Sequence, residues 1–159
     1  MAHRISVGLI SDTHGLLRPE AIEALRGSDV IIHAGDIGDP AILTELARLA
    51  PVTAIRGNID KAAWAASIPE TEAIGVGGLL IYVIHNLADL DLDPAVAGFR
   101  VVVHGHSHQP GLKDAGGVMF VNPGSAGPRR FQLPISVGRL SIEDGRVEVE
   151  LAEIELPKR

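Results

Sequence analysis

Three short apolar runs, separated by helical patterns, constrain the fold of this chain more than any other feature. The runs cover residues 4–10, 30–32 and 52–55, and each ends within a few residues of a glycine or an aspartate. Between the runs, Pro19 and the Asp39-Pro40 pair mark two helix starts, each followed by leucine and isoleucine at helical spacing. Strands joined by crossover helices usually lie parallel in one sheet. The first part of the chain therefore predicts a β-α-β-α-β unit.

The second half of the chain is organised by three dipeptides that are typical of two-residue hairpin turns. These dipeptides are Gly77-Gly78, Gly116-Gly117 and Asp144-Gly145. The strand-like runs that flank them are 72–76 and 79–85, 112–114 and 118–121, and 135–143 and 146–153. A further apolar run at 99–103 predicts a buried strand. We therefore predict a single domain over residues 1–159, of the α/β class, with a parallel first part and a hairpin-rich second part.

The composition limits the cofactors and partners of such a domain. Hydrophobic residues make up 46% of the chain and charged residues 21%, as in a globular protein. Because there is no cysteine, a bound metal must be held by nitrogen and oxygen, for which seven histidines are present. The formal net charge of −6 argues against nucleic acid or a membrane as a partner, since both attract clustered lysine and arginine. With no signal-peptide pattern, we expect a cytoplasmic protein.

Side chains that can bind metal ions follow the predicted strands at the points where the strands end. They are Asp12, His14, Asp36, Asn58, His85, His106 and His108. The carboxyl ends of the strands in an open α/β sheet meet at one edge, where ligands bind. Residues two apart in an extended segment point the same way, which should bring the Asp12–His14 and His106–His108 pairs together. The pattern predicts a metal site. Of the other histidines, His33 and His104 lie in apolar runs and are expected in the core or in support of the ligands, whereas His3 is expected to be disordered or exposed.

In order and spacing, these motifs resemble those of the calcineurin-like metallophosphoesterases, above all their small bacterial and archaeal phosphodiesterase branch. The matching segments are Asp12-Thr13-His14, Gly35-Asp36-Ile37-Gly38-Asp39, Gly57-Asn58-Ile59-Asp60, His85, Gly105-His106-Ser107-His108 and Asn122-Pro123-Gly124-Ser125. The resemblance implies a four-layer αββα sandwich with two mixed β-sheets. It also implies two divalent transition-metal ions that share Asp36. One ion would be bound by Asp12, His14, Asp36 and His108, and the other by Asp36, Asn58, His85 and His106.

The reaction that the resemblance implies is hydrolysis of a small phosphate ester, most of all a phosphodiester, by a hydroxide that bridges the two ions. Asp36 and Asn58 would be the catalytic residues, with Asn58 stabilising charge on the phosphoryl oxygens. Nitrogen and oxygen ligands suit manganese, our first expectation, and also nickel, iron, cobalt or zinc. Many family members carry a histidine where this chain has Ile59, and that histidine is thought to protonate the leaving group. We therefore expect a preference for acidic leaving groups, as in aryl phosphodiesters.

Other functions stay open beside a phosphodiesterase. A non-catalytic metal-binding scaffold of the same fold would act by binding other proteins, and a phosphomonoesterase or a nuclease would use similar chemistry. Arg129 could contact the substrate phosphate, although adjacent arginines on a loop are more often solvated. Asp39 is expected to cap its helix, and Asp60 either caps a turn or orients a ligand. A homo-oligomer, either a dimer or a tetramer, is possible by analogy with the family.

Overall fold

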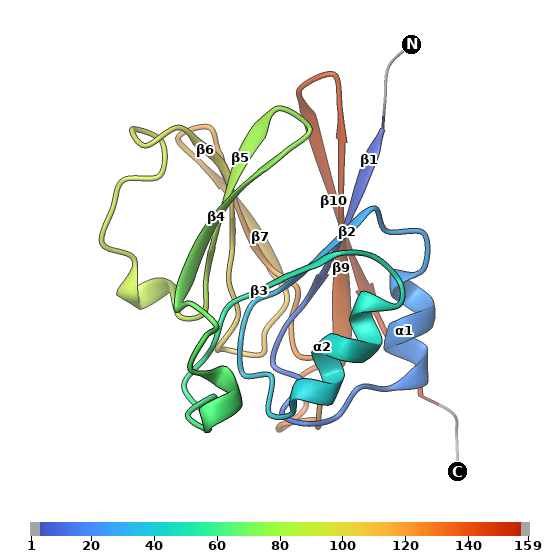
Figure 1. Cartoon of the computed structure of the whole chain (residues 1–159). Coiled ribbons are helices and arrows are strands. Elements are labelled where there is room, and N and C mark those ends of the chain that lie inside the picture. Colours follow the sequence, from blue (N-terminus) through green and yellow to red (C-terminus); the bar gives the residue numbers. More distant parts are fainter. Residues whose placement is uncertain (1–3, 157–159) are drawn as a thin grey trace.

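The computed structural model describes residues 4–156, in which two five-stranded sheets pack face to face (Figure 1). The first sheet has the order β10-β9-β1-β2-β3. Its strands are β1 (Ile5–Ile10), β2 (Val30–His33), β3 (Val52–Ala54), β9 (Ser136–Glu143) and β10 (Arg146–Glu153). Strands β1, β2 and β3 are parallel, which confirms the prediction, and the β9–β10 hairpin joins β1 antiparallel. His3 lies outside the described residues.

The second sheet has the order β4-β5-β6-β8-β7 and contains the other two predicted hairpins. Its strands are β4 (Thr71–Val76), β5 (Leu79–Ile84), β6 (Phe99–Val103), β7 (Gly111–Ala115) and β8 (Val118–Asn122). The β4–β5 and β7–β8 pairs are antiparallel hairpins, whereas β6 pairs in parallel with both β5 and β8. Both sheets are therefore mixed, as the resemblance implied.

Two helices cover the outer face of the first sheet. They are α1 (Pro19–Leu25) and α2 (Pro40–Ala47), each with proline in its first turn. The side chain of Asp39 accepts a hydrogen bond from Ala41 N at 2.9 Å, which confirms the predicted cap of α2. Period-two alternation divides the apolar side chains of β1 between two cores. Leu9 points between the sheets, whereas Ile10 packs under the helices.

The outer face of the second sheet has a much thinner cover. Within residues 4–156 no α-helix lies over it, and the segment after β5 takes that place with the 3-10 helix η2 (Leu87–Asp89). Leu87, Leu90 and Leu92 pack there on a small outer core that includes Tyr82 and Val102. A second 3-10 helix, η1 (Ala63–Ala65), lies in the loop after β3 (Figure 1). The αββα sandwich is confirmed, but its fourth layer consists of loops and a single 3-10 turn.

None of the helices described between residues 4 and 156 combines the length and apolar character needed to cross a bilayer.

Candidate metal centre

The loops after β1, β2 and β6 hold five of the predicted ligands in left-handed backbone conformations. Their φ values are 54° at Asp12, 46° at His14, 55° at Asp36, 74° at His106 and 63° at His108. Positive φ in a residue other than glycine costs roughly 1–3 kcal/mol, and such residues cluster at functional sites. The expected extended geometry of the Asp12–His14 and His106–His108 pairs is therefore wrong. Tight left-handed turns, and not strand alternation, orient these side chains.

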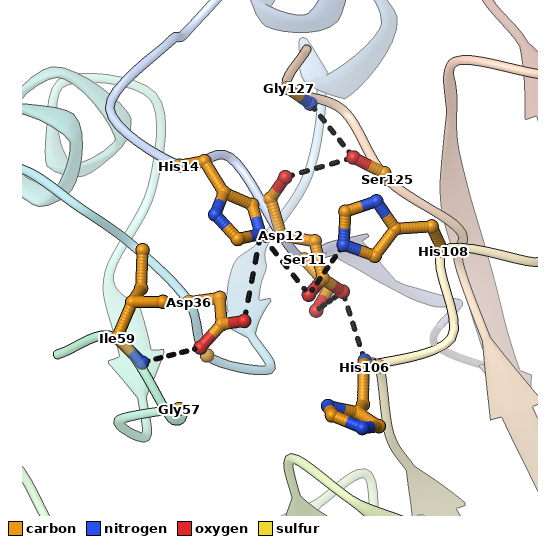
Figure 2. Close-up of polar contacts among 12 residues, drawn as sticks. Ser11, Asp12, His14, Asp36, Gly57, Ile59, His106, His108, Ser125 and Gly127 are labelled. Carbon is orange, nitrogen blue, oxygen red and sulfur yellow. Dashed lines mark hydrogen bonds and ion pairs between the residues drawn. The ribbon is translucent and has the colours of Figure 1, made fainter. Parts of the chain in front are cut away.

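The carboxylate of Asp12 lies at the middle of the cluster (Figure 2). Its Oδ1 atom is 3.8 Å from His14 Nε2, 3.7 Å from His85 Nε2 and 3.4 Å from His108 Nε2. This oxygen is buried and has no hydrogen-bond partner, and the same is true of Nε2 of His14 and His85. The other oxygen, Oδ2, accepts hydrogen bonds from Ser11 Oγ at 2.7 Å and from the backbone N–H of His106 at 3.1 Å. One side of the carboxylate is thus fixed by the protein, while the other faces three imidazoles.

Asp36 approaches the same cluster from the loop after β2. Its Oδ2 atom is 3.5 Å from His14 Nε2 and 3.2 Å from His85 Nε2, and its Oδ1 accepts from the backbone N–H of Ile59 at 3.1 Å. Nδ1 of His85 donates to the carbonyl of Ala34 at 2.7 Å. This bond places a ring proton on Nδ1 and turns Nε2 toward the two carboxylates.

These atoms form two groups that are compact enough to bind a metal ion. One group is Asp12, His14 and His108, and the other is Asp12, Asp36 and His85, with the ligand atoms of each group within 4.8 Å of one another. The groups share Asp12, whereas the resemblance implied a shared Asp36. Two ligands bonded at roughly 2.1 Å to one ion lie about 3 Å or more apart, close to the spacing of these atoms. Leaving such buried atoms without partners costs about 1–3 kcal/mol each, so the donor set fits divalent cations.

The remaining predicted residues lie at the edge of this cluster. The ring of His106 is exposed and meets the ring of His85 edge-on, with centroids 5.3 Å apart. Asn58 is also exposed and, together with His85, lines a cavity of about 700 Å³. Arg129 is exposed on the loop after Gly127 and belongs to neither ligand group.

A buried hydrogen-bond chain through His33 joins the loops after β1 and β2. The hydroxyl of Thr13 donates to the carbonyl of Ile37 at 2.9 Å and lies 3.0 Å from His33 Nε2. Because the hydroxyl proton is already used, Nε2 of His33 must donate, and Nδ1 then accepts from Gly35 N at 3.1 Å. Burial lowers the pKa of His33 to about 4, so the ring is neutral at pH 7. These hydrogen bonds tie the loop that carries Asp12 to the loop that carries Asp36 and so fix the two carboxylates relative to each other.

A second connection runs through Asp60 and joins the loops after β2 and β3. Its buried carboxylate accepts from the backbone N–H groups of Ile37 and Gly38, each at 3.0 Å, and of Gly57 at 2.9 Å. Of the two roles expected for Asp60, orientation is the one this geometry fits. Gly57 lies against the Asp36 carboxylate, where a Cβ atom would collide with it. Asp60 thus sets the position of Asp36 relative to Asn58.

The hairpin β7–β8 and the chain after it hold the third side of the cluster. The hydroxyl of Ser125 donates to the carbonyl of Asp12 at 2.9 Å (Figure 2). The amide of Asn122 donates to the carbonyl of Gly105 at 3.2 Å and to the hydroxyl of Ser107 at 3.0 Å. Sequence reasoning included Asn122 and Ser125 in a motif without a role, and it assigned no role to Thr13. Asn122 and Ser125 could have been found as polar residues between apolar residues or glycine, whereas Thr13, between Asp12 and His14, carries no such signal.

The charges of the cluster favour binding of cations. Burial alone would raise the pKa of Asp36, but hydrogen bonding and the charge of His85 outweigh it and lower the pKa to about 2. The pKa of Asp12 is also lowered, because the effects of His14, His85 and Ser11 outweigh its burial. The pKa of His108 is lowered mainly by burial. At neutral pH the cluster therefore offers two carboxylates and a neutral His108 ring. Although burial acts to lower it, hydrogen bonding to Asp36 raises the pKa of His85, so a bound cation would compete with a proton for this ring.

Comparisons with known proteins agree with this geometry. The model of the calcineurin-like phosphoesterase superfamily domain matches residues 5–145. A probable metallophosphoesterase of Methanothermobacter thermautotrophicus is 33% identical over 166 residues, which cover 95% of this chain and 94% of the relative. A phosphodiesterase of Methanocaldococcus jannaschii is 28% identical over 138 residues, covering 76% of this chain and 83% of the relative.

Solved structures share the fold. A structure described as a novel archaeal phosphodiesterase has a TM-score of 0.78 at 22% identity, covering 93% of this chain and 100% of the other. Vacuolar Protein Sorting 29 from Cryptosporidium parvum has a TM-score of 0.77 at 19% identity, covering 96% of this chain and 99% of the other. At these identities the likeness establishes the fold and not the activity.

Proposed function

Because this chain belongs to the calcineurin-like phosphoesterase superfamily, we propose that it is a phosphodiesterase that uses two divalent transition-metal ions. One observation carries the proposal: the buried, unpartnered Oδ1 of Asp12 faces the Nε2 atoms of three histidines at 3.4–3.8 Å. Three imidazoles around a bare carboxylate oxygen would be a costly arrangement unless a cation satisfied them. The phosphodiesterase among its relatives supports the diester as the substrate class.

We assign one ion to Asp12, His14, Asp36 and His108, and the other to Asp36, Asn58, His85 and His106. The position of Asp36 Oδ2, 3.5 Å from His14 and 3.2 Å from His85, supports a bridging role for this residue. Asp12 Oδ1 faces histidines of both sets, so it is the alternative bridge. Nitrogen and oxygen donors make manganese our first choice, ahead of nickel, iron, cobalt and zinc.

Two divalent ions in such a site supply positive charge to a phosphate and lower the pKa of water toward neutrality. The chain itself does the rest. The bonds from Ser11 to Asp12 and from Ile59 to Asp36 orient the two carboxylates, and the Ala34 carbonyl orients His85. The exposed amide of Asn58, which lines the cavity, is suited to donate to a phosphoryl oxygen and stabilise charge that develops there.

The proposal is tested by turnover of bis(p-nitrophenyl) phosphate after the protein is stripped of metal and reloaded with manganese. We expect metal-dependent hydrolysis that is lost in Asp36→Ala while the circular dichroism spectrum stays native. Glu148→Ala, a matched change at an exposed carboxylate on β10, should keep full activity. Manganese binding without turnover of any ester would contradict the proposal and favour the non-catalytic scaffold, a function consistent with the shared fold of Vacuolar Protein Sorting 29.

We expect protonation of the leaving group to limit the rate of this enzyme on esters with basic leaving groups. Ile59 is 46% exposed and cannot carry a proton, and its backbone N–H is already used by Asp36. Since general acid catalysis is typically worth about 10²–10⁴-fold, aryl esters should be hydrolysed far faster than alkyl esters of the same class. In Ile59→His, alkyl esters should gain more than aryl esters. Equal rates on both classes in the unaltered enzyme would show that another group supplies the proton.

A further inference from the structure

A polar cavity opens directly beside the candidate metal centre. It measures about 700 Å³, and both Asn58 and His85 line it. About half of the other residues around it are charged or carry amides, and Tyr82, Ile84 and three alanines also line it. The charged and amide residues are Arg56, Asp60, Lys61, Glu70, Asn86, Asp89 and Asp91. Arg56 is held by Glu70 at 3.3 Å, while Lys61 is exposed. This cavity is suited to hydroxyl-bearing or charged groups.

An apolar groove of about 550 Å³ lies on the other side of the same loops. Leu87 and Leu90 form one wall, and Leu112 and Phe120, from the β7–β8 hairpin, form the other. Leu112 is 46% exposed and, with Leu87, Leu90 and Phe120, forms part of one contiguous apolar surface. The groove includes Ser107, which lies in the chain between the predicted ligands His106 and His108, although neither of these histidines lines it.

A single turn of 3-10 helix, η2, separates the two spaces. A 3-10 helix has three residues per turn, so residues three apart share a face. Asn86 and Asp89 line the polar cavity, whereas Leu87 and Leu90 line the apolar groove. The side chain of Asn86 caps the turn by accepting from Ala88 N at 3.1 Å. The sequence of this one turn therefore gives the metal centre a polar side and an apolar side.

A phosphodiester carries two ester arms on one phosphorus, and the phosphate would lie between these two spaces. We propose that the enzyme selects unsymmetrical phosphodiesters, with a polar arm in the cavity next to Asn58 and an apolar arm in the groove next to Ser107. The inference rests on the proposed function. A diester with two apolar arms would force one of them against Lys61 and Asp89, and a diester with two polar arms would leave one against Leu112 and Phe120.

Binding of two small probes to the zinc-loaded, ¹⁵N-labelled protein tests the assignment without turnover. Phenyl phosphate should shift the amide resonances of β7 and β8, whereas glycerol phosphate should shift those of residues 57–66. Leu112→Arg should weaken the binding of phenyl phosphate about tenfold, as the loss of an apolar contact does. The same variant should change the affinity for glycerol phosphate by less than about twofold. Val96→Arg, which adds the same charge to a residue 84% exposed and outside both spaces, is the control and should change neither probe.

Kinetics on esters with two different arms complete the test. Lys61→Leu should raise the KM of a glyceryl p-nitrophenyl diester more than that of bis(p-nitrophenyl) phosphate, because only the first ester has a polar arm. If both monoester probes shift the same amides, or if Leu112→Arg affects both equally, the inference is wrong. If the probes sort as expected but no ester is hydrolysed with any metal, the proposed function fails and the two recognition surfaces stand.

Discussion

Six of the seven predicted ligands fall into two sets that differ in how the protein holds them, and the seventh, His14, is intermediate in burial. Asp12, Asp36, His85 and His108 are at most 5% exposed, whereas Asn58 and His106 are exposed. In the buried set, Ser11 and Ile59 donate hydrogen bonds to the carboxylates and the Ala34 carbonyl accepts one from His85, which fixes the atoms that face away from the centre. In the exposed set, the ring of His106 packs edge-on against the ring of His85. The chain thus holds the buried ligands by hydrogen bonds, whereas Asn58 and His106 are exposed and Asn58 lines the polar cavity.

The largest expected effect comes from a change in the buried set that preserves shape. In Asp36→Asn, kcat/KM on bis(p-nitrophenyl) phosphate should fall on the order of a thousandfold, because the bridging charge is lost while the acceptor for the Ile59 N–H remains. Steady-state kinetics with saturating manganese measure this loss. Glu148→Gln, the same carboxylate-to-amide change on exposed β10, should cost nothing. A loss of kcat/KM below tenfold would show that Asp36 is not a ligand of the metal centre.

The next effect concerns the connection that holds the buried set in place. Asp60→Ala leaves three backbone N–H groups without their acceptor and should lower the free energy of unfolding by about 3 kcal/mol. Urea denaturation of the metal-free protein measures the change. Asp93→Ala is the matched control, because it removes two backbone N–H bonds at an exposed turn and should cost under about 1 kcal/mol. Equal costs would mean that burial does not distinguish the two sites.

The pH dependence of stability should report the buried His33. Its pKa falls from 6.5 to about 4 on folding, so below pH 6.5 the unfolded chain binds a proton that the folded protein excludes. The contribution of His33 to the free energy of unfolding is fully present above pH 6.5. It is lost as the pH falls toward 4, by at most about 3 kcal/mol. The difference in unfolding free energy between the wild type and His33→Gln, followed from pH 7 to pH 4, isolates the effect. A constant difference would show that His33 is not kept neutral.

The smallest effect should come from the exposed set. His106→Ala should change the free energy of unfolding of the metal-free protein by less than about 0.5 kcal/mol, since the ring is exposed. Manganese titration calorimetry should nevertheless show weaker binding at one of two sites. His85→Ala, which empties a buried position, should destabilise the metal-free protein clearly more. If the two variants are equally unstable, the contrast between buried and exposed ligands does not hold.

Much of the fold could be predicted because its signals are local. The Asp39-Pro40 pair specified the cap of α2, and Gly77-Gly78, Gly116-Gly117 and Asp144-Gly145 marked the three hairpins that the structure contains. The period of the apolar residues distinguished strands from helices, and this period is a property of neighbouring residues. The thin fourth layer was not predicted, because whether any segment within residues 4–156 covers β5 and β6 with a helix depends on which sheet face each segment packs against.

The sequence by itself determined which chemical groups are available at the candidate centre: oxygen and imidazole donors without a thiolate, at the ends of successive strands. Only the tertiary structure decided how they meet. Asp12 receives hydrogen bonds from His106, 94 positions along the chain, and its carbonyl accepts from Ser125, 113 positions away. Such contacts, and the left-handed turns that they stabilise, depend on residues brought together only by folding, which no local spacing encodes. The same holds for η2, whose opposite faces become a polar and an apolar wall only once the second sheet lies beneath it.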